Sequence, residues 1–438
     1  MKILFLTNPY IIDPLGIGYL SSILKKDEHQ IDLELISEWE YKCSIFHPDV
    51  VAFSITTGQH QDYTNIARKI KNLYPKVIII FGGPHPTYFP HADDCVDYIV
   101  QGEADTSFPR LLKRIKSGEQ NIERIIKPEC LVQNLDEIPM PDRTLIYKFP
   151  QNAKNPIRNI MTSRGCPFSC PYCYNGTYKE LYKGQKIVRV HSIDRVIAEC
   201  IDVRDNHGAK FIFFIDDEFS MNDKRLEELC ARYKKEVNIP YHAQLRIDLL
   251  TEKKAKILKD SGCISVTFAI ESGGEKYRKE MLHRDMTDKQ IIDGAKLLHK
   301  YGILFRTENM IGLPFESFSD AMNTLNLNIK CRPELAWASL YQPYAGTPLG
   351  NLCIEKGLFS GTVDDIKATF FEDSVLPLPN KKRFVNLQRL FGLVVSFPIL
   401  KWILPLALRV PTNKFYSFLY AKWKKNRYDK KLYKFGGE

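Results

Sequence analysis

Short apolar runs that alternate with amphipathic stretches constrain the fold of this chain more than any other feature. In the first 110 residues, runs of strand length are separated by stretches with apolar positions at helical spacing, such as 62–73. This alternation indicates a doubly wound parallel sheet, which binds ligands at the carboxyl ends of its strands. We therefore expect an α/β, Rossmann-like domain over residues 1–140. Its expected strands are 2–7, 31–36, 50–55, 77–81 and 98–100.

A second series of strand and helix patterns begins after a proline-bearing connection that includes residues 135–143. It predicts six strands separated by helices, which indicates a partial (β/α)6 barrel over residues 150–350. Sites in barrels of this kind lie at the carboxyl ends of the strands. The expected strands are 158–162, 211–216, 241–246, 265–269, 304–310 and 337–342.

Residues 351–438 are expected to form a helical extension that is both apolar and basic. Its most apolar part, 387–411, is interrupted by Pro398, Lys401 and Pro405, and a membrane-spanning helix needs about 20 mostly apolar residues. Two interpretations stay open: a broken helix pair in a membrane interface, and a helical cap on the barrel. From residue 401 onward the chain has ten basic and two acidic residues, and this segment therefore carries most of the net charge of +10. The apolar half of the segment fits lipid better than nucleic acid, so no nucleic-acid partner is expected.

The amino terminus and the cysteines favour a cytoplasmic protein, with membrane association through the extension as an additional expectation. The start lacks the charged region, long apolar region and cleavage site of a secretory signal. Eight of the eleven cysteines are scattered singly, as reduced thiols are in cytosolic proteins.

The other three cysteines, Cys166, Cys170 and Cys173, lie within eight residues. Three thiolates can bind three irons of a [4Fe-4S] cluster and leave the fourth iron without a protein ligand. A structural zinc site would need a fourth ligand, and the nearest candidates, His191 and Cys200, lie in other predicted elements. A ferredoxin-like cluster would need a fourth cysteine. The spacing therefore favours a cluster with an open site over either alternative.

The three-cysteine loop, with Tyr172 before its last cysteine, resembles the radical S-adenosylmethionine (SAM) superfamily. Acidic, polar and glycine-bearing motifs follow the later strands in the order of that family, although Asn309 stands where a glycine often lies. The resemblance implies a cluster on the three cysteines and SAM contacts at Tyr172, Asp217, Glu218, Gln244, Arg246, Glu271, Ser272, Ile311 and Gly312.

For the chemistry, the resemblance implies reductive cleavage of SAM and formation of a 5′-deoxyadenosyl radical. No catalytic base or nucleophile is assigned beyond the cluster. The electron would come from a reductant of the flavodoxin or ferredoxin type. The alternative from another class is a cluster-bearing electron-transfer or binding protein that does not cleave SAM.

The N-terminal domain resembles the cobalamin (B12)-binding domain of one radical SAM class. Small residues let a loop backbone approach a large flat cofactor closely. The matching positions imply cobalamin contacts at Gly16, Ser54, Thr56, Gly82, Gly83, Pro84, His85, Gly102 and Glu103.

This second resemblance implies a cobalamin-dependent methyltransferase that acts on an unactivated carbon, with a lipid or lipid-linked substrate as one possibility. Three alternatives stay open. Gly16-x-Gly18 could be part of a dinucleotide fingerprint, although Ser21 replaces its third glycine. The domain could have lost cobalamin, or the enzyme could catalyse a cyclisation or rearrangement.

Overall fold

The computed structural model describes residues 1–91, 93–366, 369–371, 373–411 and 414–427. The chain forms two compact units. The first contains Met1–Asn155 and Thr177–His191, and the second contains Pro156–Gly176 and the chain from Ser192 onward.

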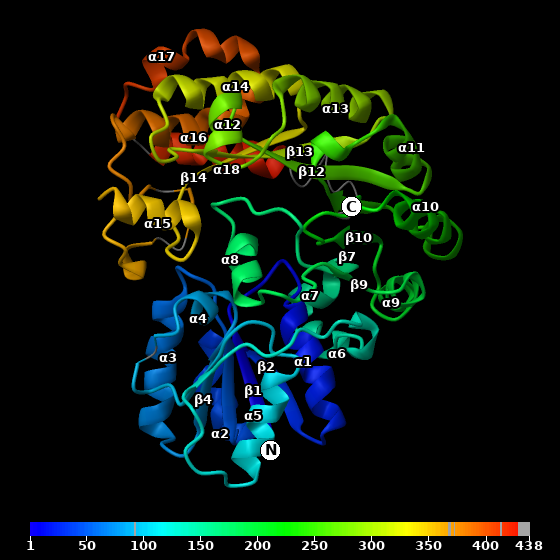
Figure 1. Ribbon diagram of the computed structural model, residues 1–438, viewed down its shortest axis with the longest axis vertical. Coiled ribbons are helices and arrows are strands. Elements are labelled where there is room, and N and C mark those ends of the chain that lie inside the picture. The colour runs from blue at the N-terminus through cyan, green and yellow to red at the C-terminus, as the bar shows by residue number, and fades with distance from the viewer. Residues whose placement is uncertain (92, 367–368, 372, 412–413, 428–438) are drawn as a thin grey trace. The chain divides into compact units, whose positions relative to one another are not determined.

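The first unit contains a parallel six-stranded sheet in the order β2-β1-β3-β4-β5-β6. The sheet is drawn in blue to cyan in Figure 1. The chain runs from β1 to β2 on one side and then to β3 on the other, so β1 and β3 flank the point at which strand order reverses. Ligands of doubly wound sheets bind at such a point. The strands are β1 (Lys2–Thr7), β2 (Gln30–Leu35), β3 (Val50–Ser54), β4 (Ile78–Gly82), β5 (Tyr98–Val100) and β6 (Ile125–Ile126).

Helices cover both faces of this sheet. Successive residues of β1 face opposite sides: Leu4 lies in a core with α2 and α3, and Phe5 lies in a core with α1 and α5. The strands are therefore apolar on both faces, as doubly wound sheets require. The helices are α1 (Leu15–Lys26), α2 (Trp39–Phe46), α3 (His60–Leu73), α4 (Pro84–Tyr88), α5 (Ser107–Lys116), α6 (Arg143–Ile146) and α7 (Pro150–Lys154).

The second unit contains a parallel six-stranded sheet in the order β7-β10-β11-β12-β13-β14. Its strands run in chain order, each paired with the next, as in a partial barrel, so the predicted fold class is confirmed. The strands are β7 (Ile157–Ile160), β10 (Phe211–Phe214), β11 (Tyr241–Gln244), β12 (Cys263–Glu271), β13 (Leu304–Ile311) and β14 (Leu335–Leu340). The predicted strands 211–216 and 241–246 extend two residues too far, because the chain leaves the sheet where the polar motifs begin.

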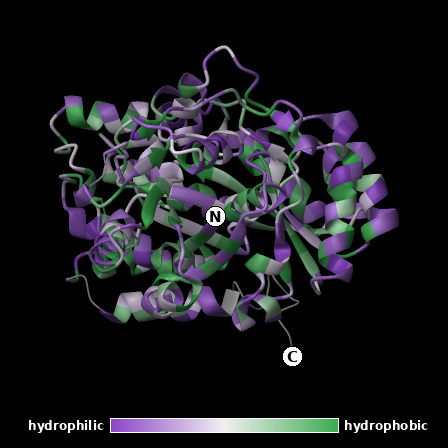
Figure 2. Cartoon of the chain, turned by 90° about the horizontal axis from the view of Figure 1, so that it is seen from below, coloured by the Kyte–Doolittle hydropathy of each residue, from purple (hydrophilic) through white to green (hydrophobic). Residues whose placement is uncertain are grey.

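Helices α9 (Ile193–Asp205), α10 (Asp223–Arg232), α11 (Glu252–Asp260) and α13 (Asp288–Lys300) pack against the outer face of this sheet and enclose its main core. Hydrophobic residues lie along the strands, and hydrophilic residues lie on the outer faces of many helices (Figure 2). The unit also contains α12 (Glu275–Glu280), α14 (Phe318–Cys331) and α15 (Pro348–Glu355). Helix α8 (Tyr174–Leu181) crosses the boundary between the units.

The C-terminal extension completes the second unit. Helix α16 (Lys381–Ser396) buries Leu387 and Phe391 in a core with β14 and α14. Helix α18 (Lys414–Arg427) places Trp423 against Phe211 and Leu335. The first half of the predicted apolar segment therefore packs on the barrel, as the helical-cap interpretation predicts.

The second half of that segment, around α17 (Leu404–Ala407), is different because many of its apolar side chains are exposed. Trp402 is 83% exposed and Leu406 is 67% exposed, whereas Leu404 and Leu408 are buried. Within the described residues, no helix has the length and apolar character needed to cross a membrane.

Candidate active site

The three-cysteine loop follows β7 and the two-residue strand β8 (Ser163–Arg164) at the carboxyl end of the barrel sheet. Gly165 has a φ of +85°, a left-handed conformation that favours glycine. Cys170 is buried, and Cys166 and Cys173 are partly exposed. Burial and, more weakly, the Asp217 carboxylate and the neighbouring Cys170 and Cys166 raise the pKa of the Cys173 thiol to about 11. The three sulfurs therefore lie close enough to influence one another.

Asp216, just after β10, fixes the start of this loop. Its buried carboxylate accepts hydrogen bonds from the Thr162 backbone N–H (3.1 Å), the Thr162 hydroxyl (2.7 Å) and the Ser163 hydroxyl (2.5 Å). Further along the loop, the Leu349 N–H donates to the Pro171 carbonyl at 2.9 Å. Long-range contacts thus position a loop that has little regular structure of its own.

Arg246 packs on the same loop from the end of β11. Its guanidinium lies 3.8 Å from the centroid of the Phe168 ring and makes two hydrogen bonds to the Asp248 carboxylate, at 3.1 and 2.8 Å. Arg246 is therefore an ion-paired residue that supports the cluster loop.

Two neighbouring acidic residues predicted to bind SAM have different environments. Glu218 is buried, and its carboxylate accepts hydrogen bonds from the backbone N–H groups of Ser220 (2.9 Å) and Arg246. Asp217 is exposed, and nearby protein atoms raise the pKa of its carboxyl group. Asp217 therefore presents a carboxylate beside the cluster loop, whereas Glu218 holds strand ends together.

The buried Glu271 pairs with Tyr172 of the cysteine loop, which is partly exposed. The Tyr172 hydroxyl donates to Glu271 Oε1 at 2.9 Å, and burial raises the pKa of Glu271 to about 7. Glu271 has a φ of +66°, and strained backbone of this kind is common at functional sites. Arg284 also contacts Tyr172. Arg284 was not predicted as a site residue. The sequence does place this charged residue between two apolar residues, Leu282 and Met286, which are both buried.

The other predicted SAM contacts on β12 and β13 are enclosed. Ser272 and Ile311 are fully buried, and the Gly312 N–H donates to Glu316 Oε2 at 2.6 Å. Burial raises the pKa of Glu316 to about 8. These residues shape the turns at the strand ends, and any contact they make to a ligand would be through the backbone.

The inner face of the barrel sheet is polar near its centre. In the strand register Gln244 pairs with Thr267, and Glu308 of β13 pairs with Ala269 and Trp337. The Glu308 side chain is 38% exposed although β13 lies inside the sheet, so this face opens onto accessible space. Glu308 forms an ion pair with Arg306, which stacks on Trp337 at 4.5 Å. None of these three residues was predicted from the sequence as a site residue.

The cysteine loop fits an iron–sulfur cluster. Across the residues that the structure covers, no three His, Cys, Asp or Glu side chains converge closely enough to bind one metal ion. A cubane cluster does not require that convergence, because each thiolate binds a different iron. Cys166, Cys170 and Cys173 on one loop, with an arginine behind Cys170, provide the donors and a compensating charge.

In the first unit, several predicted cobalamin residues lie at the carboxyl edge of the sheet. Gly16, Ser54, Thr56 and Pro84 are exposed there, and Gly82 ends β4. Gly83 has a φ of +92°, and an added Cβ would lie 2.7 Å from the Ile55 nitrogen. Glycine at position 83 therefore lets two loop backbones pack closely at this edge, and the exposed positions beside them leave the edge open to a ligand.

His85 is buried and packed instead of projecting from this edge. Its ring stacks on His60 at 4.2 Å, and its Nδ1 lies 3.1 Å from the Thr57 hydroxyl. His85 therefore supports the loop.

The structure gives Gly102 and Glu103 another role. The Glu103 carboxylate binds Arg189 and accepts a hydrogen bond from Tyr178 at 2.5 Å. A Cβ on Gly102 would lie 2.0 Å from the Tyr182 hydroxyl. Both residues hold segment 177–191 against the first sheet.

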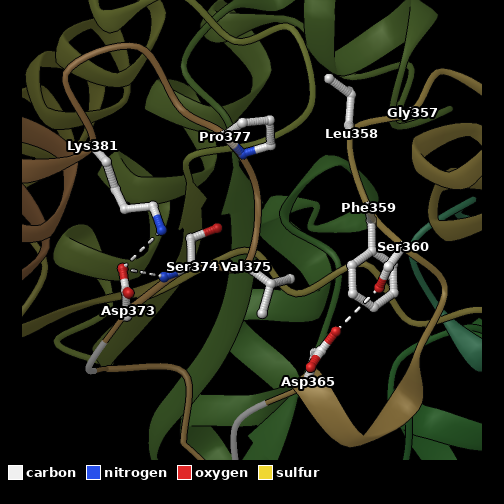
Figure 3. Close-up of a pocket in the computed structure, with 10 residues that line it drawn as sticks. All are labelled: Gly357, Leu358, Phe359, Ser360, Asp365, Asp373, Ser374, Val375, Pro377 and Lys381. Carbon is white, nitrogen blue, oxygen red and sulfur yellow. Dashed lines mark hydrogen bonds and ion pairs between the residues drawn. The ribbon is translucent and has the colours of Figure 1, made fainter.

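A pocket of about 550 Å³ lies in the second unit (Figure 3). Its lining residues lie within 357–365 and 373–381, and they include the Asp373–Lys381 ion pair (3.4 Å) and Asp365, which accepts from the Ser360 hydroxyl at 3.1 Å. None of its lining residues belongs to the cysteine loop or to the motifs at the strand ends.

Two known families match different parts of the chain. The radical SAM superfamily matches residues 160–327, and the B12 binding domain matches residues 1–112. A protein of Pyrococcus horikoshii named as an uncharacterized methyltransferase is 32% identical over 370 residues, covering 79% of this chain and 79% of its own length. The chain belongs to the B12-binding radical SAM enzymes.

Membership of the B12-binding radical SAM enzymes confirms the predicted cofactors: a [4Fe-4S] cluster, SAM and cobalamin. Such an enzyme also needs an external reductant and a substrate. A hopanoid C-3 methylase of Methylococcus capsulatus is 24% identical over 300 residues, covering 62% of this chain and 56% of that protein. The cobalamin-dependent SAM radical enzyme OxsB shares the fold, with a TM-score of 0.68, 16% identity, and coverage of 98% of this chain and 72% of that one.

Proposed function

We propose that this B12-binding radical SAM enzyme transfers a methyl group to an unactivated carbon. The observation that carries the proposal is the presence of the three-cysteine loop and a B12-binding domain in one chain. The relative named as a methyltransferase supports it. When bound, the cluster supplies an electron for SAM cleavage and cobalamin carries the methyl group.

The chain's own residues would bind and orient these groups. Cys166, Cys170 and Cys173 would hold the cluster, and the exposed Asp217 carboxylate would bind the amino group of SAM. Gln244 and backbone groups near Gly312 would bind its other polar atoms, and Arg246 would keep the loop in place. Gly16, Ser54, Thr56, Gly83 and Pro84 would form the cobalamin edge. We further propose that a flavodoxin or ferredoxin supplies the electron.

The test uses the full chain, reconstituted anaerobically with iron, sulfide and hydroxocobalamin, and SAM with a deuterated methyl group. With titanium(III) citrate as reductant, we expect 5′-deoxyadenosine, and S-adenosylhomocysteine up to one equivalent per cobalamin. Cys170→Ala should abolish the first product, whereas the exposed Cys130→Ala should retain both. 5′-Deoxyadenosine without S-adenosylhomocysteine would favour rearrangement, and the absence of both products from the cofactor-loaded wild-type enzyme would overturn the proposal.

We also propose a lipid or lipid-linked substrate that is reached from an anionic membrane surface. The supporting observation is a group of exposed apolar side chains in the C-terminal extension, beyond its buried part. We call it the 397–418 surface, and it is formed by the exposed residues Phe397, Ile399, Trp402, Ile403, Leu406, Val410, Phe415 and Phe418. Burying side chains of this size gains roughly 1.5–3 kcal/mol each.

Charge around the 397–418 surface favours anionic headgroups. No acidic residue occurs between Asp373 and Asp429, whereas Lys401, Arg409 and Lys414 lie within or beside the surface. Basic residues near an anionic membrane contribute about 1 kcal/mol each, and salt weakens this contribution. The combination of exposed apolar groups and one sign of charge is typical of interfacial segments.

Vesicle flotation tests the membrane proposal. The full chain should float with vesicles of 30% phosphatidylglycerol in phosphatidylcholine, and less with pure phosphatidylcholine. The double variant Trp402→Glu, Leu406→Glu should bind at least about tenfold more weakly, since it removes two large apolar anchors. Leu73→Glu, at another exposed apolar position, should bind like the wild type. Equal flotation of both variants, or none by the wild type, would overturn the proposal.

A further inference from the structure

Arg284 is a buried charge that the predicted SAM and cluster contacts do not include. It lies in the loop 281–287 between α12 and α13. Alternate residues of this segment are buried: Leu282 and Met286 are 0% and 2% exposed, and Arg284 between them is 5% exposed. Burying an arginine costs several kcal/mol unless partners compensate it. The contacts of the Arg284 guanidinium therefore indicate the role of this charge.

The guanidinium of Arg284 faces the back of the cysteine loop. Nη2 donates to the Ala269 carbonyl at 2.7 Å, and Nη1 lies 3.3 Å from the Tyr172 hydroxyl and 4.0 Å from Cys170 Sγ. The Tyr172 hydroxyl in turn donates to Glu271. One side chain thus contacts a cluster cysteine, the aromatic residue of the loop and strand β12.

A second buried arginine holds the segment that carries Arg284. Arg278 is fully buried and donates to the carbonyls of Met286 (2.9 Å) and Ser272 (2.6 Å) and to Asp288 (2.8 Å). The Arg284 backbone N–H also donates to the Arg278 carbonyl at 3.0 Å. These bonds fix the backbone that carries Arg284, and the Ala269 carbonyl and the Tyr172 hydroxyl hold its guanidinium beside Cys170.

We propose that Arg284 is a positioning residue that raises the reduction potential of the [4Fe-4S] cluster. This rests on the proposed role of Cys170 as a cluster ligand. Reduction adds one negative charge to the cluster, and a fixed positive charge with an N–H···S contact stabilises that state. Hydrogen bonds to sulfur and nearby charge are established determinants of cluster potential. Arg284 also orients Tyr172, so it fixes the shape of the loop around the cluster.

The test is an EPR-monitored redox titration of the anaerobically reconstituted full chain. Arg284→Gln removes the charge and should lower the midpoint potential of the cluster. Arg284→Lys keeps the charge but loses the planar guanidinium, so its midpoint potential should lie between those of Arg284→Gln and the wild type. Arg246→Gln is the matched control, because its charge is already paired with Asp248 and it contacts the loop through Phe168. It should shift the potential less than Arg284→Gln does.

Iron content and thermal unfolding distinguish this role from a general structural one. An unchanged potential in Arg284→Gln with four irons per chain would overturn the proposal. Loss of iron at unchanged unfolding temperature in both Arg284 variants would support a positioning role, and loss of iron with a lowered unfolding temperature in both would overturn it. If the wild type itself gave no reducible [4Fe-4S] signal, the assignment of the three cysteines would fail instead.

Discussion

The backbone N–H of Arg246 donates to the carboxylate of Glu218, which joins the end of β11 to the end of β10 through a side chain. The side chain of the adjacent Asp217 is exposed instead. Two acidic neighbours in one motif therefore have separable roles.

Asp217→Asn and Glu218→Gln should separate these roles. Asp217→Asn should leave the unfolding free energy within about 0.5 kcal/mol of the wild type and weaken SAM binding roughly tenfold or more, since a hydrogen bond to a charged group contributes about 1.5–3 kcal/mol. Glu218→Gln should lower the unfolding free energy by about 1–3 kcal/mol. Calorimetric SAM titration and chemical denaturation measure the two effects, and equal SAM affinity of Asp217→Asn and the wild type would contradict the assignment.

Gly83 should tolerate a methyl group far less well than its neighbour Gly82. An alanine at position 83 requires a left-handed backbone and places its Cβ 2.7 Å from the Ile55 nitrogen, whereas a Cβ at position 82 meets ordinary contacts at 3.7 Å. We expect Gly83→Ala to destabilise the first unit by about 1–3 kcal/mol and to reduce cobalamin retention, with Gly82→Ala close to the wild type. Absorbance of bound cobalamin after gel filtration, together with thermal unfolding, checks this, and similar behaviour of the two variants would count against it.

Packing of α18 on the barrel should depend on Gly392. A Cβ there would lie 2.1 Å from the Trp423 ring, whose indole N–H donates to the Ser396 hydroxyl at 2.9 Å. Gly392→Ala should therefore cost about 1–3 kcal/mol from overpacking, in spite of alanine's higher helix propensity. Gly16→Ala is the control, because that helical glycine has nothing within 4 Å of the added Cβ. Tryptophan fluorescence during denaturation monitors the change, and unaltered stability of Gly392→Ala would contradict the packing.

His242 should make the second unit less stable in acid. Its ring is buried between the Ser265 and Thr267 hydroxyls, at 2.7 and 2.9 Å, and burial lowers its pKa from 6.5 to about 3. Below pH 6.5 the unfolded chain binds a proton that the folded chain excludes, so this contribution is present at neutral pH and is lost as the pH falls. Between pH 7.5 and 5 the wild type should lose about 2 kcal/mol more unfolding free energy than His242→Asn. Denaturation curves at both pH values measure this difference, and parallel losses would refute it.

Much of the fold could be predicted because its signals are local. Apolar runs of strand length alternating with helical periodicity were sufficient for the doubly wound sheet and the partial barrel, since those periods follow from backbone geometry. The two-residue strand β6 was not predicted, because Ile125–Ile126 is too short to show a pattern. The apolar segment 387–411 could not be assigned to core or surface from composition, since its buried and exposed halves are similarly hydrophobic.

The sequence by itself was sufficient for the family and for the prediction of the three cluster cysteines, because three candidate ligands on one short loop are recognised by their spacing within eight residues. Only the tertiary structure decided which charged residues support the site. Arg284 reaches Cys170 across 114 residues, and Arg189 reaches Glu103 across 86. The physical reason is that the environment of a charged group depends on which distant segments surround it. The carboxylate of Asp217 is exposed, whereas that of its neighbour Glu218 is enclosed.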